Sequence, residues 1–282
     1  MATLWNNYRY LILRRLTQVG ILVLYFGSNA WGWTILMGNL SSSILFDMIP
    51  MSDPYAALQM LAAGAVLATD LLLGVAIVGI FYLLIGGRAF CSWVCPINMI
   101  TDFAALMRKW TGMNRLQGVK QPASRNMRYW ILALSLIISF IMGLTAFEFI
   151  SPISMVHRGI IFGLGFGWAA MLVIFLFDLF VLKNGWCGHI CPLGGFYSIV
   201  GKFSLIRVLH SEENCTLCMK CKDVCPENQV LYMIGKESIS VTSGECTNCA
   251  RCIEVCDDDA LGFSIRKLAQ NKKTGELNEN NE

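Results

Sequence analysis

Eight of the twelve cysteines lie in two runs of identical spacing in the C-terminal part of the chain. The runs are Cys215-x2-Cys218-x2-Cys221-x3-Cys225 and Cys246-x2-Cys249-x2-Cys252-x3-Cys256. This is the spacing of proteins that hold two [4Fe–4S] clusters, where each run gives three thiolates to one cluster and its fourth to the other. The predicted ligands are therefore Cys215, Cys218, Cys221 and Cys256 for a first cluster, and Cys246, Cys249, Cys252 and Cys225 for a second. Zinc is the alternative, but it usually takes two ligand pairs from separate C-x2-C knuckles.

The other four cysteines form a second repeated pattern, C-x3-C-P. Its two copies are Cys91-x3-Cys95-Pro96 and Cys187-x3-Cys191-Pro192, offset from each other by 96 positions. Each proline is suited to the first turn of a helix, because its missing N–H would have no partner there. The four thiols could hold a third metal centre, act as redox-active thiols, or be reduced, buried cysteines. His189 lies inside the second copy, as a metal ligand or as a hydrogen-bonding neighbour.

The elements that must position these cysteines are strongly apolar. Hydrophobic residues make up 55% of the chain and charged residues 15%, with a mean hydropathy of +0.55, which indicates a membrane protein. Each predicted span has about 22 residues, so a helix of that length would measure about 33 Å, enough to cross a bilayer core. The predicted spans are about 16–37, 62–84, 129–150 and 160–182.

The distribution of positive charge predicts the orientation of these spans. Of the 22 Lys and Arg residues, only Arg158 falls in the two loops 38–61 and 151–159. By the positive-inside rule, both termini then face the cytoplasm of a bacterial inner membrane. All twelve cysteines fall on the same, reducing side. Cations flank apolar spans and form no stripe interleaved with aromatic residues, so nucleic acid is not an expected partner.

The predicted fold is an all-α, four-helix transmembrane domain made of duplicated hairpins, followed by a small α+β domain like a two-cluster bacterial ferredoxin. The predicted boundaries are 1–203 for the membrane domain, 204–268 for the ferredoxin-like domain, and 269–282 for a polar, disordered tail. We expect an amphipathic helix after Pro96, and a pair of strands at 230–234 and 238–242.

Ionisable residues near membrane spans are candidates for a quinol site. Oxidation of a quinol releases two protons with its two electrons, so the site needs a proton acceptor. The predicted outward side carries five such groups: Asp47, Asp53, Asp70, Glu148 and His157. Each could instead be an interfacial residue in contact with water, or a helix cap.

Several segments resemble the NapH family, the membrane ferredoxin-type subunits of periplasmic nitrate reductase systems. The resemblance includes Leu13-Arg-Arg-Leu16, the segment 38–54 with its Ser-Ser-Ser, both C-x3-C-P motifs and both ferredoxin runs. The larger NosR and CcoG-type polyferredoxins share the cysteine motifs but carry extra domains for which this chain has no room. The resemblance implies a quinol dehydrogenase subunit that passes electrons, with a NapG-like iron–sulfur partner, towards a periplasmic nitrate reductase.

Two other functions remain open at this point. One is a membrane scaffold or maturation polyferredoxin that does not oxidise quinol. The other is a thiol redox sensor in which Cys91, Cys95, Cys187 and Cys191 switch between dithiol and disulfide. The chemistry of an electron-transfer subunit would reside in two [4Fe–4S] clusters and the quinone pool of the lipid bilayer.

Overall fold

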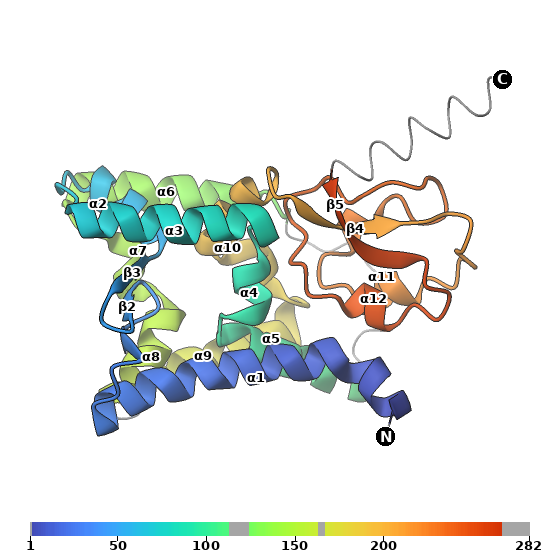
Figure 1. Ribbon diagram of the computed structural model, residues 1–282, viewed down its shortest axis with the longest axis horizontal. Helices are drawn as coiled ribbons and strands as arrows, with labels where there is room; N and C mark the ends of the chain where they lie inside the picture. The colour runs from blue at the N-terminus through green and yellow to red at the C-terminus, as the bar shows by residue number, and fades with distance from the viewer. Residues whose placement is uncertain (1, 113–123, 163–166, 267–282) are drawn as a thin grey trace. The chain divides into compact units, whose positions relative to one another are not determined.

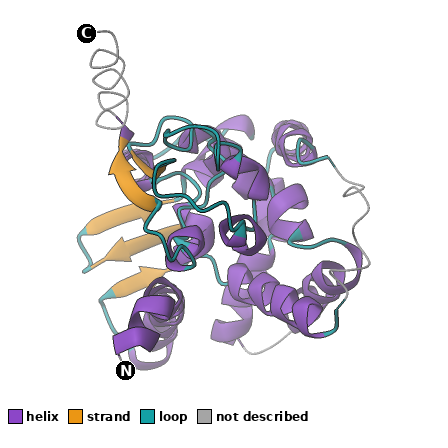
Figure 2. Cartoon of the chain, turned by 90° about the vertical axis from the view of Figure 1, so that its right-hand side faces the viewer, coloured by secondary structure: helices purple, strands orange, loops and turns teal. Residues whose placement is uncertain are grey.

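The computed structural model describes residues 2–112, 124–162 and 167–266, and divides the chain into two compact units. Unit 1 comprises 1–16, 82–93 and 197–282, and unit 2 comprises 17–81 and 94–196. Unit 1 therefore includes three stretches of the predicted membrane domain, 1–16, 82–93 and 197–203. Most of the described chain is helical (Figure 2). The strands form two small sheets, one of three strands and one of two. The predicted tail, 269–282, lies outside the described residues.

Unit 1 contains the two ferredoxin runs. Its sheet pairs β4 with β5 in antiparallel register, from Ile206 opposite Ile265 to His210 opposite Leu261. Figure 1 shows this sheet beside the short helices α11 and α12. The core beneath it is formed by apolar side chains and by cysteines of both runs. The elements are α4 (Ala89–Trp93), β4 (Ile206–His210), α11 (Lys220–Val224), η4 (Asn228–Leu231), α12 (Arg251–Glu254) and β5 (Leu261–Ile265).

The strand pair predicted at 230–234 and 238–242 is wrong. Residues 228–231 form the 3-10 helix η4, and Ser240 makes a single bridge with Leu209. Val230 and Leu231 are adjacent in sequence and both are 1% exposed. A strand would point neighbouring side chains to opposite faces, whereas a tight helical turn buries both.

Unit 2 carries most of the helical chain. Helix α2 begins at Pro54, and the carboxylate of Asp53 caps it by accepting the backbone N–H of Tyr55 at 3.4 Å. Its helices are α2 (Pro54–Ala62), α5 (Ile97–Trp110), α6 (Met127–Met142), α7 (Ala146–Ile150), α8 (Pro152–Phe162), α9 (Gly167–Leu176), and the π-helices η2 (Phe177–Val181) and η3 (Trp186–Ile190). Three helices contribute residues to both units: α1 (Ala2–Trp31), α3 (Thr69–Ile85) and α10 (Pro192–Gly201).

Unit 2 also contains a three-stranded antiparallel sheet, so the expectation of an all-α membrane domain is wrong here. The strands are β1 (Leu36–Gly38), β2 (Ser42–Leu45) and β3 (Ile49–Ser52). The turn between β1 and β2 is fixed by the side chain of Asn39, whose oxygen accepts the N–H groups of Ser41 and Ser42 at 2.9 and 2.8 Å.

Three of the four apolar helices are shorter than the spans predicted for them. Among the described residues, one helical stretch, Tyr8–Trp31, is long and apolar enough to cross a membrane. Helix α6 ends where Gly143 adopts φ 65°, a left-handed C-cap that stops the helix eight residues before the predicted end. The three shorter apolar stretches are Thr69–Ile85, Met127–Met142 and Gly167–Val181.

Candidate iron–sulfur site

The two cysteine loops share the same unusual backbone. In the first loop Leu217 and Met219 both have φ 59°, and at the equivalent positions of the second loop Asn248 and Ala250 have φ 47° and 60°. None of the four is glycine, so each loop retains a conformation that L-residues rarely adopt. Left-handed residues inside a turn direct successive backbone N–H groups to one side, and such nests bind anions and iron–sulfur clusters.

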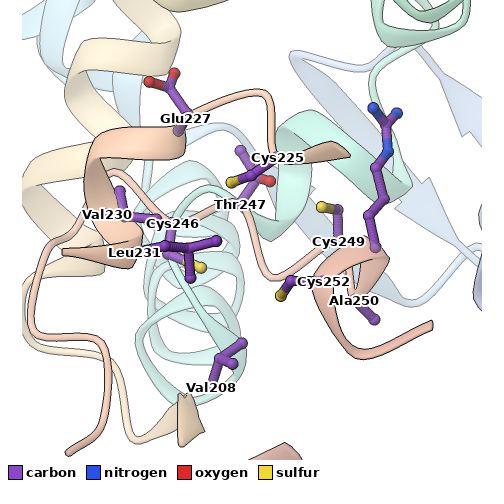
Figure 3. A pocket seen from close by; sticks show the side chains of 11 residues that line it. Val208, Cys225, Glu227, Val230, Leu231, Cys246, Thr247, Cys249, Ala250 and Cys252 are labelled. Carbon is purple, nitrogen blue, oxygen red and sulfur yellow. The ribbon is translucent and has the colours of Figure 1, made fainter. Parts of the chain in front are cut away.

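The four cysteines predicted to hold the second cluster line one pocket of about 360 Å³, a volume that includes its open mouth. Cys225, Cys246, Cys249 and Cys252 come from both runs, and their sulfur atoms face a common space (Figure 3). We call this site the cluster-2 pocket. Cys225 of the first run thus lies beside three cysteines of the second run. The assignment of ligands to the two clusters stays a prediction.

The first loop is linked to the residues that follow Cys256. The hydroxyl of Thr216 donates to Asp258 at 2.6 Å, and the ammonium of Lys220 donates to Asp257 at 2.6 Å. These contacts place the end of the second run beside the first loop. Cys221 is buried in the apolar core of unit 1, and Cys215 and Cys256 pack against that core, whereas Cys218 is exposed.

Two thiols of the cluster-2 pocket, those of Cys246 and Cys252, are hard to ionise without a metal. Burial raises the pKa of the Cys246 thiol to about 11, and the nearby Cys249 adds to the increase, whereas the guanidinium groups of Arg207 and Arg88 oppose it. Burial also raises the pKa of Cys252. A bound metal displaces the protons of the thiols. Part of the free energy of metal binding therefore offsets the cost of forming four buried thiolates. The residues present fit a [4Fe–4S] cluster, which would supply one-electron redox chemistry here.

In the part of the chain that the structure describes, no three His, Cys, Asp or Glu side chains come together as ligands of one ion. A cubane does not require this, because each of its four cysteines binds a different iron.

The C-x3-C-P cysteines fall in both units. Cys91 lies in α4 of unit 1, and Cys95, Cys187 and Cys191 belong to unit 2, where His189 is buried in η3. Helix α10 begins at Pro192, as predicted, and α5 begins directly after Pro96. A third centre at these cysteines, or a redox role for their thiols, stays a prediction.

The five candidate quinol residues lie in unit 2 in unlike surroundings. Asp47 and Asp70 are exposed, and Asp53 caps α2. Glu148 accepts hydrogen bonds from the hydroxyls of Ser41 at 2.7 Å and Ser154 at 2.5 Å.

His157 is the buried member of this group. It is 4% exposed and stacks edge-on against Tyr25, with 4.9 Å between ring centroids. Its Nε2 is buried without a hydrogen-bond partner among the described residues. Burial lowers the pKa of His157, which favours the neutral form of its imidazole.

Comparison with known proteins bears on both cysteine patterns. Residues 207–257 match the family model of a 4Fe-4S dicluster domain, and residues 67–114 and 164–209 each match that of a 4Fe-4S binding domain. The chain is 43% identical to the methylamine utilization ferredoxin-type protein MauN of Methylorubrum extorquens, over 86% of this chain and 84% of that protein. It is also 43% identical to the ferredoxin-type protein NapH of Escherichia coli, over 80% of this chain and 78% of that protein. No solved structure matches the chain.

The chain belongs to the MauN/NapH family of ferredoxin-type proteins. The resemblance to NapH drawn from the sequence is confirmed, and MauN proteins are as similar. Members of this family are iron–sulfur electron-transfer proteins with 4Fe–4S domains, and the N-terminal candidate membrane helix is in keeping with a place at the membrane. The two matches to one 4Fe-4S model, 97 residues apart at their starts, agree with the repeat of the C-x3-C-P motif.

Sequence reasoning missed four charged residues at the cluster-2 pocket, and one of them, Arg251, lines the pocket. Arg88 and Glu227 form an ion pair at 2.7 Å with side chains 2% and 3% exposed, and Glu227 also lines the pocket. Arg207, on β4, is 2% exposed. The sequence offers a weak signal for Arg88, which is a lone cation between an apolar stretch and Cys91. It offers none for the partner Glu227, which lies 139 residues later.

Proposed function

We propose that this protein is a membrane-bound iron–sulfur subunit that oxidises quinol and passes the electrons to a partner protein. The observation that carries the proposal is the cluster-2 pocket, in which four thiols from two distant runs face one space (Figure 3). Two clusters bound by the eight predicted cysteines would carry single electrons from a two-electron donor.

Two features support quinol as the donor. Large apolar side chains lie exposed on the helices of the predicted membrane domain, among them Ile80, Phe140 and Val173, which are 59%, 74% and 65% exposed. Such surfaces are suited to lipid. The buried His157 and the carboxylate of Glu148 are available to take up the two protons that a quinol releases. Four membrane spans with both termini in the cytoplasm remain part of this proposal.

The acceptor is proposed from the relatives. Similarity to NapH supports a NapG-like iron–sulfur partner and electron delivery towards a periplasmic nitrate reductase. The equal identity to MauN supports a second candidate, the same electron-transfer role in methylamine utilization. Deletion of the gene in the source bacterium separates the two, since growth with nitrate as electron acceptor should fail in the first case and growth on methylamine in the second.

The test of quinol oxidation uses the full chain, purified anaerobically and placed in lipid vesicles. Addition of a reduced quinol should bleach the visible absorbance of the oxidised clusters within seconds. Intact clusters that fail to respond to any of several quinols would refute the proposal and favour a scaffold or maturation role. Absence of acid-labile sulfide would refute the iron–sulfur site itself.

A further inference from the structure

The two cysteine sites have unlike electrostatic surroundings. The ion pair beside the first loop, Lys220 with Asp257, has side chains 53% and 75% exposed, so water and salt screen it. Cys218 of that loop is also exposed. The ion pair beside the cluster-2 pocket, Arg88 with Glu227, is almost fully buried.

Two buried guanidinium groups, of Arg88 and Arg207, lie near the cluster-2 pocket, and the half-buried Arg251 also lines it. Nη1 of Arg88 donates to Glu227 at 2.7 Å and to the carbonyl of Glu245 at 2.9 Å, one residue before Cys246. Arg207 donates to the backbone carbonyls of Ser243, at 2.9 Å, and of Ser204 and Gly201. Within the described structure Arg207 thus has carbonyl partners and no carboxylate, so its full positive charge remains.

A cluster held by four thiolates becomes more negative by one charge when it accepts an electron. Nearby positive charge stabilises that reduced state, and the effect is strongest where burial limits screening. The acids that follow Cys256 have the opposite sign: Asp257 and Asp258 hydrogen-bond to the first loop. The carboxylate of Glu227 points away from the pocket sulfurs (Figure 3), so it offsets the charge of Arg88 only in part.

We propose that Arg88 and Arg207 make the cluster-2 pocket the higher-potential of the two sites, so that an electron shared between the clusters resides there. Arg88 and Arg207 would act on the potential through their positive charge, because neither side chain is a cluster ligand. The inference rests on the proposed pair of clusters, but it holds whether quinol or another donor supplies the electron.

The test is a redox titration of the full-length protein in detergent, followed by EPR. The wild type should show two centres of different potential, and the Cys249→Ala variant should lose the higher one. Arg88→Gln and Arg207→Gln should each lower the ratio of reduced to oxidised cluster in the pocket about tenfold at fixed ambient potential, a shift of about 59 mV. Arg88→Lys keeps the charge and should restore most of the potential.

The direction in which a matched variant shifts the potential separates an electrostatic effect from structural damage. Glu227→Gln removes the opposing charge and should raise the potential of the same centre, whereas Lys220→Gln, at the exposed pair, should leave it unchanged. Equal potentials in the wild type, or shifts of the same sign for Arg88→Gln and Glu227→Gln, would overturn this inference and leave the proposed function standing. A preparation with one cluster or none would overturn both.

Discussion

The crossed ligand sets can be tested by counting iron in pairs of variants. Cys225 is in the first run by sequence but lines the cluster-2 pocket. Full loading corresponds to about eight iron atoms per chain, and Cys225→Ala should reduce this to about four, because one cubane is lost. Adding Cys249→Ala should cost no further iron, since that thiol serves the same cluster. Adding Cys218→Ala instead should bring the content near zero.

An uncrossed arrangement would give the opposite result for the two double variants. If Cys225 served the first cluster, the pair with Cys218→Ala would keep about four iron atoms and the pair with Cys249→Ala would lose nearly all. Iron and acid-labile sulfide are measured on protein purified anaerobically, with size-exclusion chromatography to show that each variant is folded. The reciprocal variant, Cys256→Ala, should behave as the mirror image.

Three further predictions concern the fold and the quinol site. Gly244→Ala should destabilise the fold by about 1–3 kcal/mol and so lower the thermal unfolding midpoint, because the new methyl group would overlap backbone atoms of Ser198 and Lys202. The control is Gly262→Ala, where the new methyl group would enter open space. Ala250→Val should impair cluster loading, since a β-branched residue is strained at φ 60°, whereas Ala250→Gly should load normally. His157→Gln should slow quinol oxidation about 100-fold with both clusters intact, by loss of a proton acceptor, and equal turnover in the variant and wild type would exclude this role.

The cysteine chemistry was predictable because it is local in sequence. Three thiols at x2 gaps must come from one tight loop, so spacing alone assigns the loop, and the family match agrees with it. The crossing of the fourth ligand was likewise predicted and stays a prediction, supported by the position of Cys225 in the lining of the cluster-2 pocket. The left-handed backbone of Leu217 and Ala250 was not predictable, since neither residue type favours positive φ.

Long-range pairing was predicted poorly. The strands β4 and β5 join the two ends of the ferredoxin-like region, so no short turn marks them in the sequence. The helix after Pro96 was predicted, but its buried face includes Arg108, which is 1% exposed and donates to the carbonyl of Asp178 at 2.7 Å. A cationic side chain can be assigned to the solvent-exposed face of a helix only where no buried carbonyl lies within its reach.

Residues 85–93 form hydrogen bonds with the second cysteine loop and support its backbone. The side-chain amide of Asn248 donates to the carbonyls of Ile85 at 2.7 Å and Ile206 at 3.1 Å, and Gly86, at φ 139°, leaves room for it. The indole of Trp93 donates to the carbonyl of Asn248 at 3.1 Å. Asn248 is one of the residues with positive φ, so these bonds hold the strained turn of the cluster-2 pocket in place. Residues 82–93 therefore complete the unit that the eight predicted ligands alone would leave unsupported.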